Sequence, residues 1–288
     1  MTLQKGQSSA AEMKAGFRPG KRHWFLLAVS AAALLLMFFY ALTDGAHINH
    51  DPLLTTADWA GYALCHRITE RSFTIYGRQF PLCARCTGMY LGAALTIAAL
   101  FLAGRTKWVL LPRKGLFLAF LGLIALMGID GLNSYSHFFP NAPHLYEPRN
   151  WLRLTTGMGA GLTLGLIVFA ALAQSLWREP RYAPLVKNFR EFAALLLLGL
   201  LAVILVLSNQ PALLYVLALV STAGLLFVVT SLNTAVLSVI LRRDGQATTW
   251  SATIGLLLAG FVLAVLELGA ISAVRWTMTG TMVGFPGL

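Results

Sequence analysis

All three cysteines of the chain fall within residues 65–92, a stretch that reads CHRITERSFTIYGRQFPLCARCTGMYLG. Cys83 and Cys86 are three positions apart at the expected start of a helix, which places both sulfur atoms on one face. Cys65 precedes this pair by a loop long enough to fold back onto it. Three thiolates and one imidazole form a common tetrahedral zinc shell, so we predict a metal site, most simply for zinc, that includes these three cysteines.

The sequence leaves the fourth ligand of this metal site open. His66 supplies the nearest imidazole, but it follows Cys65 directly, and neighbouring residues rarely bind one ion without strain. Because sites with three thiolates are usually closed, a structural or binding metal is favoured over a catalytic one. If the metal is catalytic, its bound water attacks a phosphate ester or amide of a lipid-linked substrate, with Asp130 orienting it or accepting a proton. The other candidate ligands are His47, His50, His137, His144 and a water molecule.

Two other interpretations of the cysteines stay open. A structural or redox-active disulfide is compatible with the extracytoplasmic side on which we place them below. The thiols can also be inert groups in a packed interface. Haem attachment is disfavoured, because Thr87 occupies the position at which the C-x-x-C-H motif requires histidine. No thioredoxin-like pattern of strands and helices surrounds the pair.

Arginines in and after the same stretch predict a site for an anion. Helix N-termini present unpaired backbone N–H groups, and guanidinium groups bind phosphate or carboxylate strongly. The predicted ligand is an anionic lipid head group or a lipid-linked substrate, and Asn150 is expected to cap the helix that starts beside it. Alternatively, the arginines pair with nearby acidic residues or extend to lipid phosphates. The residues of this set are Arg67, Arg71, Arg78, Arg85, Asn150 and Arg153.

Two acidic residues lie inside apolar segments, where a charge is costly and usually faces a cavity or a partner. We expect Asp130 to pair with Arg153, because each lies about one helical turn inside the same membrane boundary. Asp130 is also a weaker candidate for a metal ligand or a general base. Glu267 is either a proton carrier or a hydrogen-bonded packing residue, and Asn233 is expected to form an interhelical hydrogen bond.

The composition indicates what kind of protein positions these residues. Of the 288 residues, 57% are hydrophobic and 11% are charged, whereas soluble domains carry roughly 25% charged residues. Such a chain is expected to be an all-α, polytopic protein of the cell membrane, with the lipid bilayer as its partner. The net charge of +11 does not indicate nucleic-acid binding, since the basic residues lie between apolar segments.

Seven apolar segments are each close to the roughly 20 residues that cross a bilayer. They are predicted at about residues 24–43, 81–104, 115–135, 151–176, 192–208, 212–241 and 250–273. The polar residues from Ser208 to Pro211 predict a turn between the fifth and sixth segments. Glycines at four-residue steps predict that the second and fourth helices touch, and these are Gly88, Gly92, Gly157, Gly161 and Gly165.

The distribution of basic residues predicts the orientation. Fifteen of the 22 Lys and Arg residues fall on the side of the N-terminus and seven on the other side. The positive-inside rule then places the N-terminus in the cytoplasm and the C-terminus outside. Residues 44–80 form an extracytoplasmic segment, with a short helix from Thr56 to Ile68 behind a capping box that starts at Thr55. Pro81 is expected in the first turn of the second span.

The motifs C-H-R-x-x-x-R-S-F and G-x-Q-F-P-L-C-x-R-C-x-G-x-Y resemble an uncharacterised family of prokaryotic multi-pass membrane proteins that carry a domain of unknown function. The later Asp130-Gly131, Asn150 with Arg153, and Thr156-Gly157 fit the same family. The resemblance covers about residues 60–170 and implies that these residues belong together, but it implies no activity. We divide the chain into a cytoplasmic basic tail (1–23), a membrane domain (24–176) and a C-terminal three-helix portion (177–288).

These observations predict an integral membrane protein with a metal site beside an arginine-rich anion or head-group pocket at its outer face. Whether the protein is an enzyme is left open. A transporter or channel that uses Asp130 and Glu267 is the first alternative, although the sequence shows no inverted repeat and no helix broken in mid-membrane. A membrane thiol–disulfide or lipid-phosphate enzyme is the second.

Overall fold

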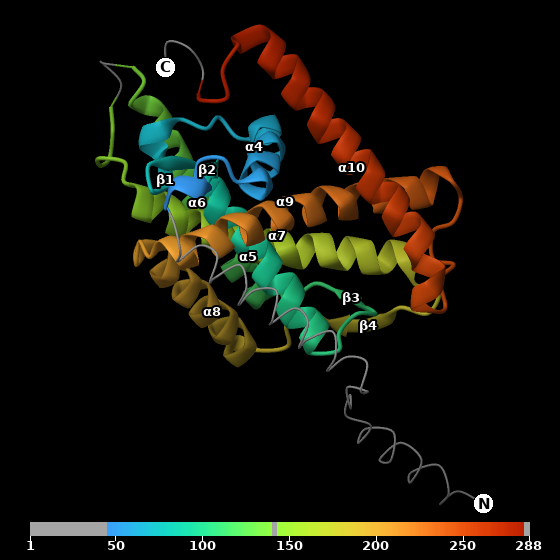
Figure 1. Cartoon of the computed structure of the whole chain (residues 1–288). Helices are drawn as coiled ribbons and strands as arrows, with labels where there is room; N and C mark the ends of the chain where they lie inside the picture. The colour runs from blue at the N-terminus through green and yellow to red at the C-terminus, as the bar shows by residue number, and fades with distance from the viewer. Residues whose placement is uncertain (1–44, 140–142, 285–288) are drawn as a thin grey trace, which may run out of the picture.

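The computed structural model describes residues 45–139 and 143–284 and is mainly helical (Figure 1). Within these residues, six helices are long and apolar enough to cross a membrane. They coincide with the second to seventh predicted spans, whereas the first, residues 24–43, lies outside the described residues. These helices are α5 (Ala84–Leu102), α6 (Lys114–Ser136), α7 (Asn150–Leu176), α8 (Phe189–Leu207), α9 (Pro211–Ile240) and α10 (Trp250–Thr279).

Shorter elements lie at the two ends of α5 (Figure 1). At its start, which we call the cysteine end, are α3 (Gly45–Ile48), α4 (Pro52–Leu64), the 3-10 turn η1 (Thr69–Arg71) and the antiparallel strands β1 (Ser72–Ile75) and β2 (Arg78–Cys83). At the opposite end, which we call the strand end, are the parallel strands β3 (Trp108–Leu110) and β4 (Arg181–Pro184).

Two predicted element boundaries at the cysteine end are wrong. Instead of running from Thr56 to Ile68, α4 starts at Pro52, because the Asp51 side chain caps it by accepting the backbone N–H of Leu54 at 2.8 Å. Pro81 lies in β2 rather than in a helix, and α5 starts at Ala84. A proline fits the first turn of a helix and an edge strand equally well, so its local signal did not distinguish the two.

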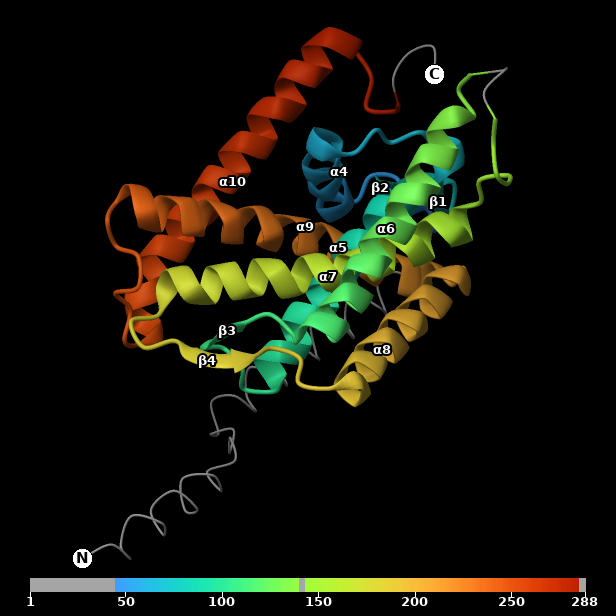
Figure 2. The same ribbon diagram turned by 180° about the vertical axis from the view of Figure 1, so that it is seen from behind.

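The helices α5 and α7 form the closest helix pair of the structure (Figure 2). A Cβ atom added at Gly88 would overlap the backbone carbonyl of Leu154, and one at Gly161 would overlap that of Met89. Both helices therefore approach backbone to backbone, as small residues at four-residue steps allow. This confirms the predicted contact between the second and fourth spans, and it brings the starts of α5 and α7 together.

The C-terminal helices wrap around this pair. α8 and α9 are separate, as predicted, and Asn209 between them adopts a φ of 54° in the left-handed region. α9 packs on α5 and α7, and α10 crosses α9 and continues to α4 (Figures 1 and 2). Asn233 Nδ2 donates to Glu267 Oε2 at 2.8 Å. This bond confirms the interhelical role of Asn233 and gives Glu267 a partner inside the bundle.

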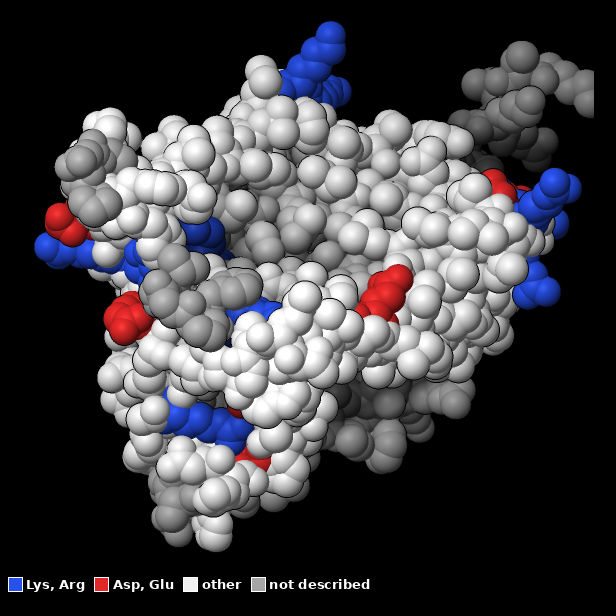
Figure 3. Space-filling model, turned by 90° about the horizontal axis from the view of Figure 1, so that it is seen from above, with Lys and Arg blue, Asp and Glu red and all other residues white. Residues whose placement is uncertain are grey.

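Much of the surface of the protein is uncharged, as contact with lipid requires. Uncharged residues cover most of the face seen from above, and Lys and Arg side chains show at its margins and in small groups within its left half (Figure 3). An apolar cavity of about 550 Å³ lies between α5, α7, α9 and α10, toward the strand end, and its lining includes Phe101, Trp177 and Phe227. Because it lies along the second half of α5, this cavity is separate from the cysteines.

Candidate metal centre and arginine cluster

The end of α4 positions Cys65. Its backbone N–H donates to the carbonyl of Gly61 at 2.8 Å, so Cys65 closes the last turn of the helix. Gly61 lies directly against the backbone of Pro81 in β2, where a Cβ atom would overlap the carbonyl. This close approach places the C-terminus of α4 beside the strand that ends at Cys83.

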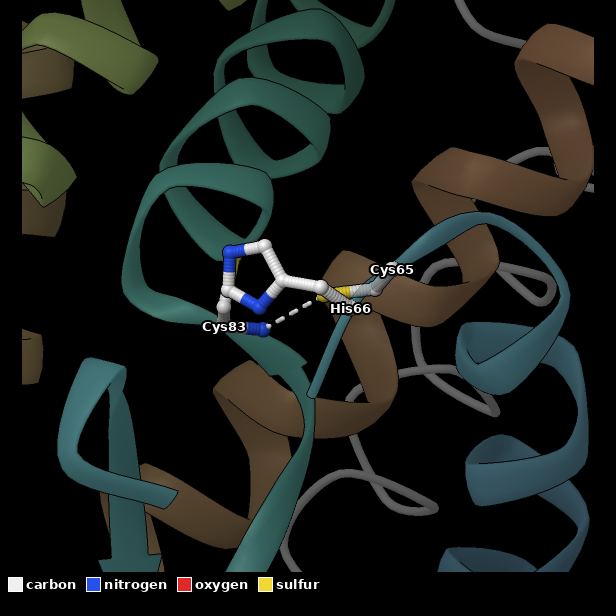
Figure 4. A group of neighbouring side chains, drawn as sticks. All are labelled: Cys65, His66 and Cys83. Carbon is white, nitrogen blue, oxygen red and sulfur yellow. Dashed lines mark hydrogen bonds between the residues drawn. The ribbon is translucent and has the colours of Figure 1, made fainter. Parts of the chain in front are cut away.

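A β-hairpin positions the second thiol. β1 and β2 pair through Ser72 and Cys83, and the chain reverses at Tyr76 and Gly77, which have φ values of 48° and 84°. Cys83 is the residue immediately before α5, so the helix carries Cys86 one turn further on. The backbone N–H of Cys83 donates to the Sγ of Cys65 at 3.1 Å (Figure 4).

Cys65, His66 and Cys83 form a group whose potential ligand atoms all lie within 4.8 Å of one another (Figure 4). In the part of the chain that the structure describes, this is the one such group of three. Both cysteines are nearly inaccessible, at 2% and 3% exposure. The thiols are free, and the geometry brings two sulfur donors and a partly buried imidazole together in a group that could hold a metal ion.

Cys86 lies one helical turn beyond Cys83, next to this group but not a member of it. The neighbouring thiols of Cys83 and Cys86 lower the pKa of Cys65 well below its ordinary value. The interaction with Cys65, together with burial, raises the pKa of Cys83 to about 12. Of these two thiols, Cys65 is therefore the more easily ionised.

His66 is the imidazole of this group, and one of its ring nitrogens already has a hydrogen-bond partner. Its Nδ1 accepts the backbone N–H of Ile68 at 3.2 Å, so the proton of the neutral ring lies on Nε2. Burial lowers the pKa of His66, and its neighbours Arg71, Arg85 and Arg153 lower it further. To bind a metal ion, this ring must give up its hydrogen bond to Ile68.

None of the other histidines proposed as ligands belongs to the cysteine group as the structure describes it. His137 and His144 stack on each other with ring centroids 4.0 Å apart, and His137 Nε2 lies 3.2 Å from the carbonyl oxygen of Tyr146. His47 and His50 are exposed in the segment around α3. Of the candidates for a fourth protein ligand, the fold brings His66 alone to the thiols.

The structure divides the predicted anion-binding residues into two groups. In the first, Arg67 Nη2 and Arg78 Nη2 each lie 2.8 Å from a carboxylate oxygen of Asp58 on α4. Arg67 is buried, with 4% of its side chain exposed, and its φ of 48° is in the left-handed region. Both arginines form ion pairs with this one carboxylate, and these pairs hold the loop after Cys65 against α4.

The second group, which we call the arginine cluster, consists of Arg71, Arg85 and Arg153. All three converge on Ser134 of α6: Arg85 and Arg153 reach its Oγ at 3.2 and 3.4 Å, and Arg71 its carbonyl at 3.5 Å. The buried carboxylate in contact with the cluster is Asp130, whose Oδ2 lies 2.5 Å from Arg85 Nη2. Three cations thus face one buried anion.

The predicted pairing of Asp130 with Arg153 is wrong. Asp130 pairs with Arg85 on α5, whereas Arg153 Nη1 donates to Asn150 Oδ1 at 2.9 Å. Asn150 is the first residue of α7 and not its cap, which is Arg149, and its side chain also donates to the carbonyl of Glu70 at 3.0 Å. The prediction used the similar depth of Asp130 and Arg153 in their helices. Depth alone does not determine which sides of two helices face each other.

Tyr146 and Ser134 complete the arginine cluster, and sequence reasoning missed both. Tyr146 Oη donates to Asp130 Oδ1 at 3.1 Å, and burial, with the adjacent carboxylate, raises the pKa of Tyr146. The side chain of Asn133 holds this tyrosine by donating to its carbonyl at 2.8 Å. The position of Ser134 could have been predicted, because it follows Asp130 by four residues and therefore lies on the same face of the helix.

Residues 65–167 match a family described as predicted membrane proteins (DUF2085). An uncharacterized protein of Methanothermobacter thermautotrophicus is 35% identical over 104 residues, which cover 36% of this chain and 83% of that protein. An uncharacterized protein of Methanocaldococcus jannaschii is 25% identical over 163 residues, which cover 55% of this chain and 98% of that protein. No solved structure matches. The matched residues contain the three cysteines and the whole arginine cluster.

Proposed function

This chain belongs to the DUF2085 family of predicted membrane proteins, and from that premise we propose that it binds a metal ion, most simply zinc, beside a site for an anionic group. The observation that carries the proposal is the group of Cys65, His66 and Cys83, with Cys86 one helical turn beyond Cys83 in α5. Thiolates select zinc over harder ions such as magnesium and calcium. Cys65, Cys83 and Cys86 are the proposed ligands, and His66 or a water molecule is the fourth.

A structural or binding role suits this metal better than a catalytic one. Three thiolates neutralise the charge of the ion and leave it a weak Lewis acid. The ion would join the end of α4 to the hairpin and to the start of α5, because each supplies one of the ligands. It would therefore hold the segment 44–80 on the membrane helices.

The arginine cluster supports the second half of the proposal. Arg71, Arg85 and Arg153 outnumber the one buried carboxylate, so an added anion is attracted to the excess positive charge. Guanidinium groups bind the oxygens of phosphate with two parallel hydrogen bonds. We propose the phosphate of a lipid head group or of a lipid-linked substrate as this anion, at the extracytoplasmic face predicted from the basic residues.

The metal content of the purified protein tests the proposal. Wild-type protein in detergent should contain about one zinc ion per chain, and Cys83→Ser should retain much less, because the site loses one of its three thiolates. Ser251→Ala, an exposed serine near the strand end, should keep the metal. Mass spectrometry of metals and a thiol titration are measured in parallel. Wild-type protein that contains no metal and has a single titratable thiol would contradict the proposal and indicate a disulfide.

The alternative functions stay predictions. A transport pathway would use Asp130 and Glu267, and a thiol–disulfide or lipid-phosphate enzyme would use the cysteines or the metal. Among the described residues, Asp130 is bonded to Arg85 and Tyr146, and Glu267 is bonded to Asn233. These bonds give both carboxyl groups packing partners, and they do not favour transport over metal binding.

A further inference from the structure

Arg275 of α10 lies against the segment that carries the first thiol. Its Nη1 donates to the carbonyl oxygens of Tyr62 and Cys65 at 2.7 and 2.6 Å, and its Nη2 donates to that of His66 at 3.2 Å. One guanidinium thus holds three backbone carbonyls, one in the last turn of α4 and two in the residues that follow the helix. Two of them belong to residues of the metal-binding group.

The C-terminal end of α4 explains why a cation is stabilised at this position. The last carbonyls of α4 have no partner within the helix and carry a partial negative charge, which a cation stabilises. The guanidinium carbon also lies 4.0 Å from the ring centroid of Tyr62, which adds a cation–π contact. Its planar fork reaches several oxygens at once, whereas a lysine ammonium offers one compact centre.

Other contacts hold α10 in place beside α4. Ser272 Oγ donates to the carbonyl of Trp59 at 2.6 Å, one turn before Arg275 on the same helix. The hydroxyls of Tyr62 and Thr279 lie 2.7 Å apart, one turn after it. Arg275 therefore approaches Cys65 from a helix that is fixed on both sides of the contact, and it orients the backbone from which the sulfur projects.

We propose that Arg275 is a positioning residue of the metal centre, which holds the backbone of Cys65 and His66 so that the Cys65 sulfur meets Cys83. Arg275 lies outside residues 65–167, the part that matches the family. The C-terminal portion thus completes the metal-binding site instead of only extending the membrane domain. This inference rests on the proposed metal site, and its test separates the two.

The test uses the full chain in detergent, loaded with Co²⁺ in place of zinc, whose sulfur-to-metal absorption reports thiolate ligation. Groups that orient metal ligands typically change the affinity about 10–100-fold when removed. Arg275→Ala should weaken Co²⁺ binding by about that factor and change the absorption. Arg275→Lys should give an intermediate affinity, because it restores the charge but not the fork. Thr277→Ala, an exposed residue two positions further along α10, should bind as the wild type does.

A second measurement keeps the inference testable if a variant is unstable or if the ion does not bind. In metal-free protein, the alkylation rate of Cys65 is followed by peptide mass mapping, and it should rise in Arg275→Ala and less in Arg275→Lys. Co²⁺ affinity within twofold of the wild type in both variants, with unchanged alkylation, would overturn the role of Arg275. Wild-type protein that binds no Co²⁺ would overturn the metal site itself, whereas an unchanged alkylation rate of Cys65 in Arg275→Ala would overturn the positioning of this backbone by Arg275 independently of the metal.

Discussion

At the scale of single residues, Asp58 controls how the loop after Cys65 is held. Its two carboxylate oxygens each accept a guanidinium, from Arg67 and from Arg78, and 4% of the Arg67 side chain is exposed. A buried cation that loses its partner is costly, since it has neither water nor a counter-charge. Arg67 and Arg78 therefore serve the conformation of this loop, and Arg71, Arg85 and Arg153 remain the candidates for the proposed anion site.

The substitution Asp58→Asn tests this role. It should lower the free energy of unfolding by about 3 kcal/mol, because Arg67 and Arg78 lose a shared carboxylate. Glu70→Gln, which changes an exposed carboxylate in η1, should be close to neutral. Denaturant unfolding in detergent micelles measures both. Equal stability of the two variants would show that Arg67 finds another partner.

The arginine cluster makes a prediction about anion binding. Arg153→Gln should weaken the binding of inorganic phosphate about tenfold, since a charge-assisted hydrogen bond contributes about 1.5–3 kcal/mol. Arg149→Gln, at an exposed arginine one turn earlier, should change it little. Calorimetry with inorganic phosphate tests the free ion, and nanodiscs with and without phosphatidylglycerol test a head group. A wild-type protein that binds neither would rule out the proposed anion site.

At the scale of the elements, the contact between α5 and α7 brings the metal and arginine groups together. Arg85 and Cys86 belong to α5, and Arg153 belongs to α7, so their distance depends on how closely these helices approach. Backbone atoms of Arg85 itself lie against Gly157. A side chain at this contact would separate the helices and would move Arg85 away from Arg153 at the same time.

Gly161→Ala is the corresponding prediction. The new methyl group would overlap the carbonyl of Met89, and the variant should lose about 1–3 kcal/mol of stability. Gly255→Ala is the matched control, because nothing lies near its added methyl group and alanine favours a helix by about 1 kcal/mol. Thermal unfolding in detergent compares them. A stability of Gly161→Ala at or above that of the control would show that the helices do not depend on this approach.

At the scale of the whole molecule, the two ends of the helix bundle differ in chemistry. The cysteine end holds the thiols and the arginine cluster, whereas β3, β4 and the connection between α9 and α10 lie at the strand end (Figure 1). The strand end carries most of the basic residues in the described connections, including Arg178, Arg242 and Arg243. The positive-inside rule predicts that this end faces the cytoplasm, and the proposed metal and anion sites would then lie outside.

Reporter fusions test this orientation. Alkaline phosphatase fused after Leu288 should be active, because that enzyme folds only outside the cytoplasm, and green fluorescent protein at the same site should be dark. The reverse is expected for fusions after Arg243, in the connection between α9 and α10. A fluorescent fusion at Leu288 would contradict the seven-span topology with a cytoplasmic N-terminus, since α10 would then end in the cytoplasm.

The sequence by itself determined the helices and much of the chemistry. Continuous apolar stretches and their length predict the spans, since a bilayer demands about 20 apolar residues wherever the chain crosses it. The glycine steps predicted the contact of α5 with α7, because backbone approach depends only on the absence of a side chain. The positions of Cys65, Cys83 and Cys86 likewise indicated a thiol cluster before any geometry was known.

Only the tertiary structure decided which polar groups meet. Asp130 has an arginine within reach on two helices, and the rotation of α5 and α7 about their axes selects Arg85 over Arg153. Asp58 pairs with Arg67 and Arg78, two of the residues predicted to bind an anion, and Arg275 reaches the Cys65 carbonyl from the far end of the chain. The cause is the same in each case: a local pattern determines an element, whereas the partner of a polar side chain depends on the packing of elements that are distant in sequence.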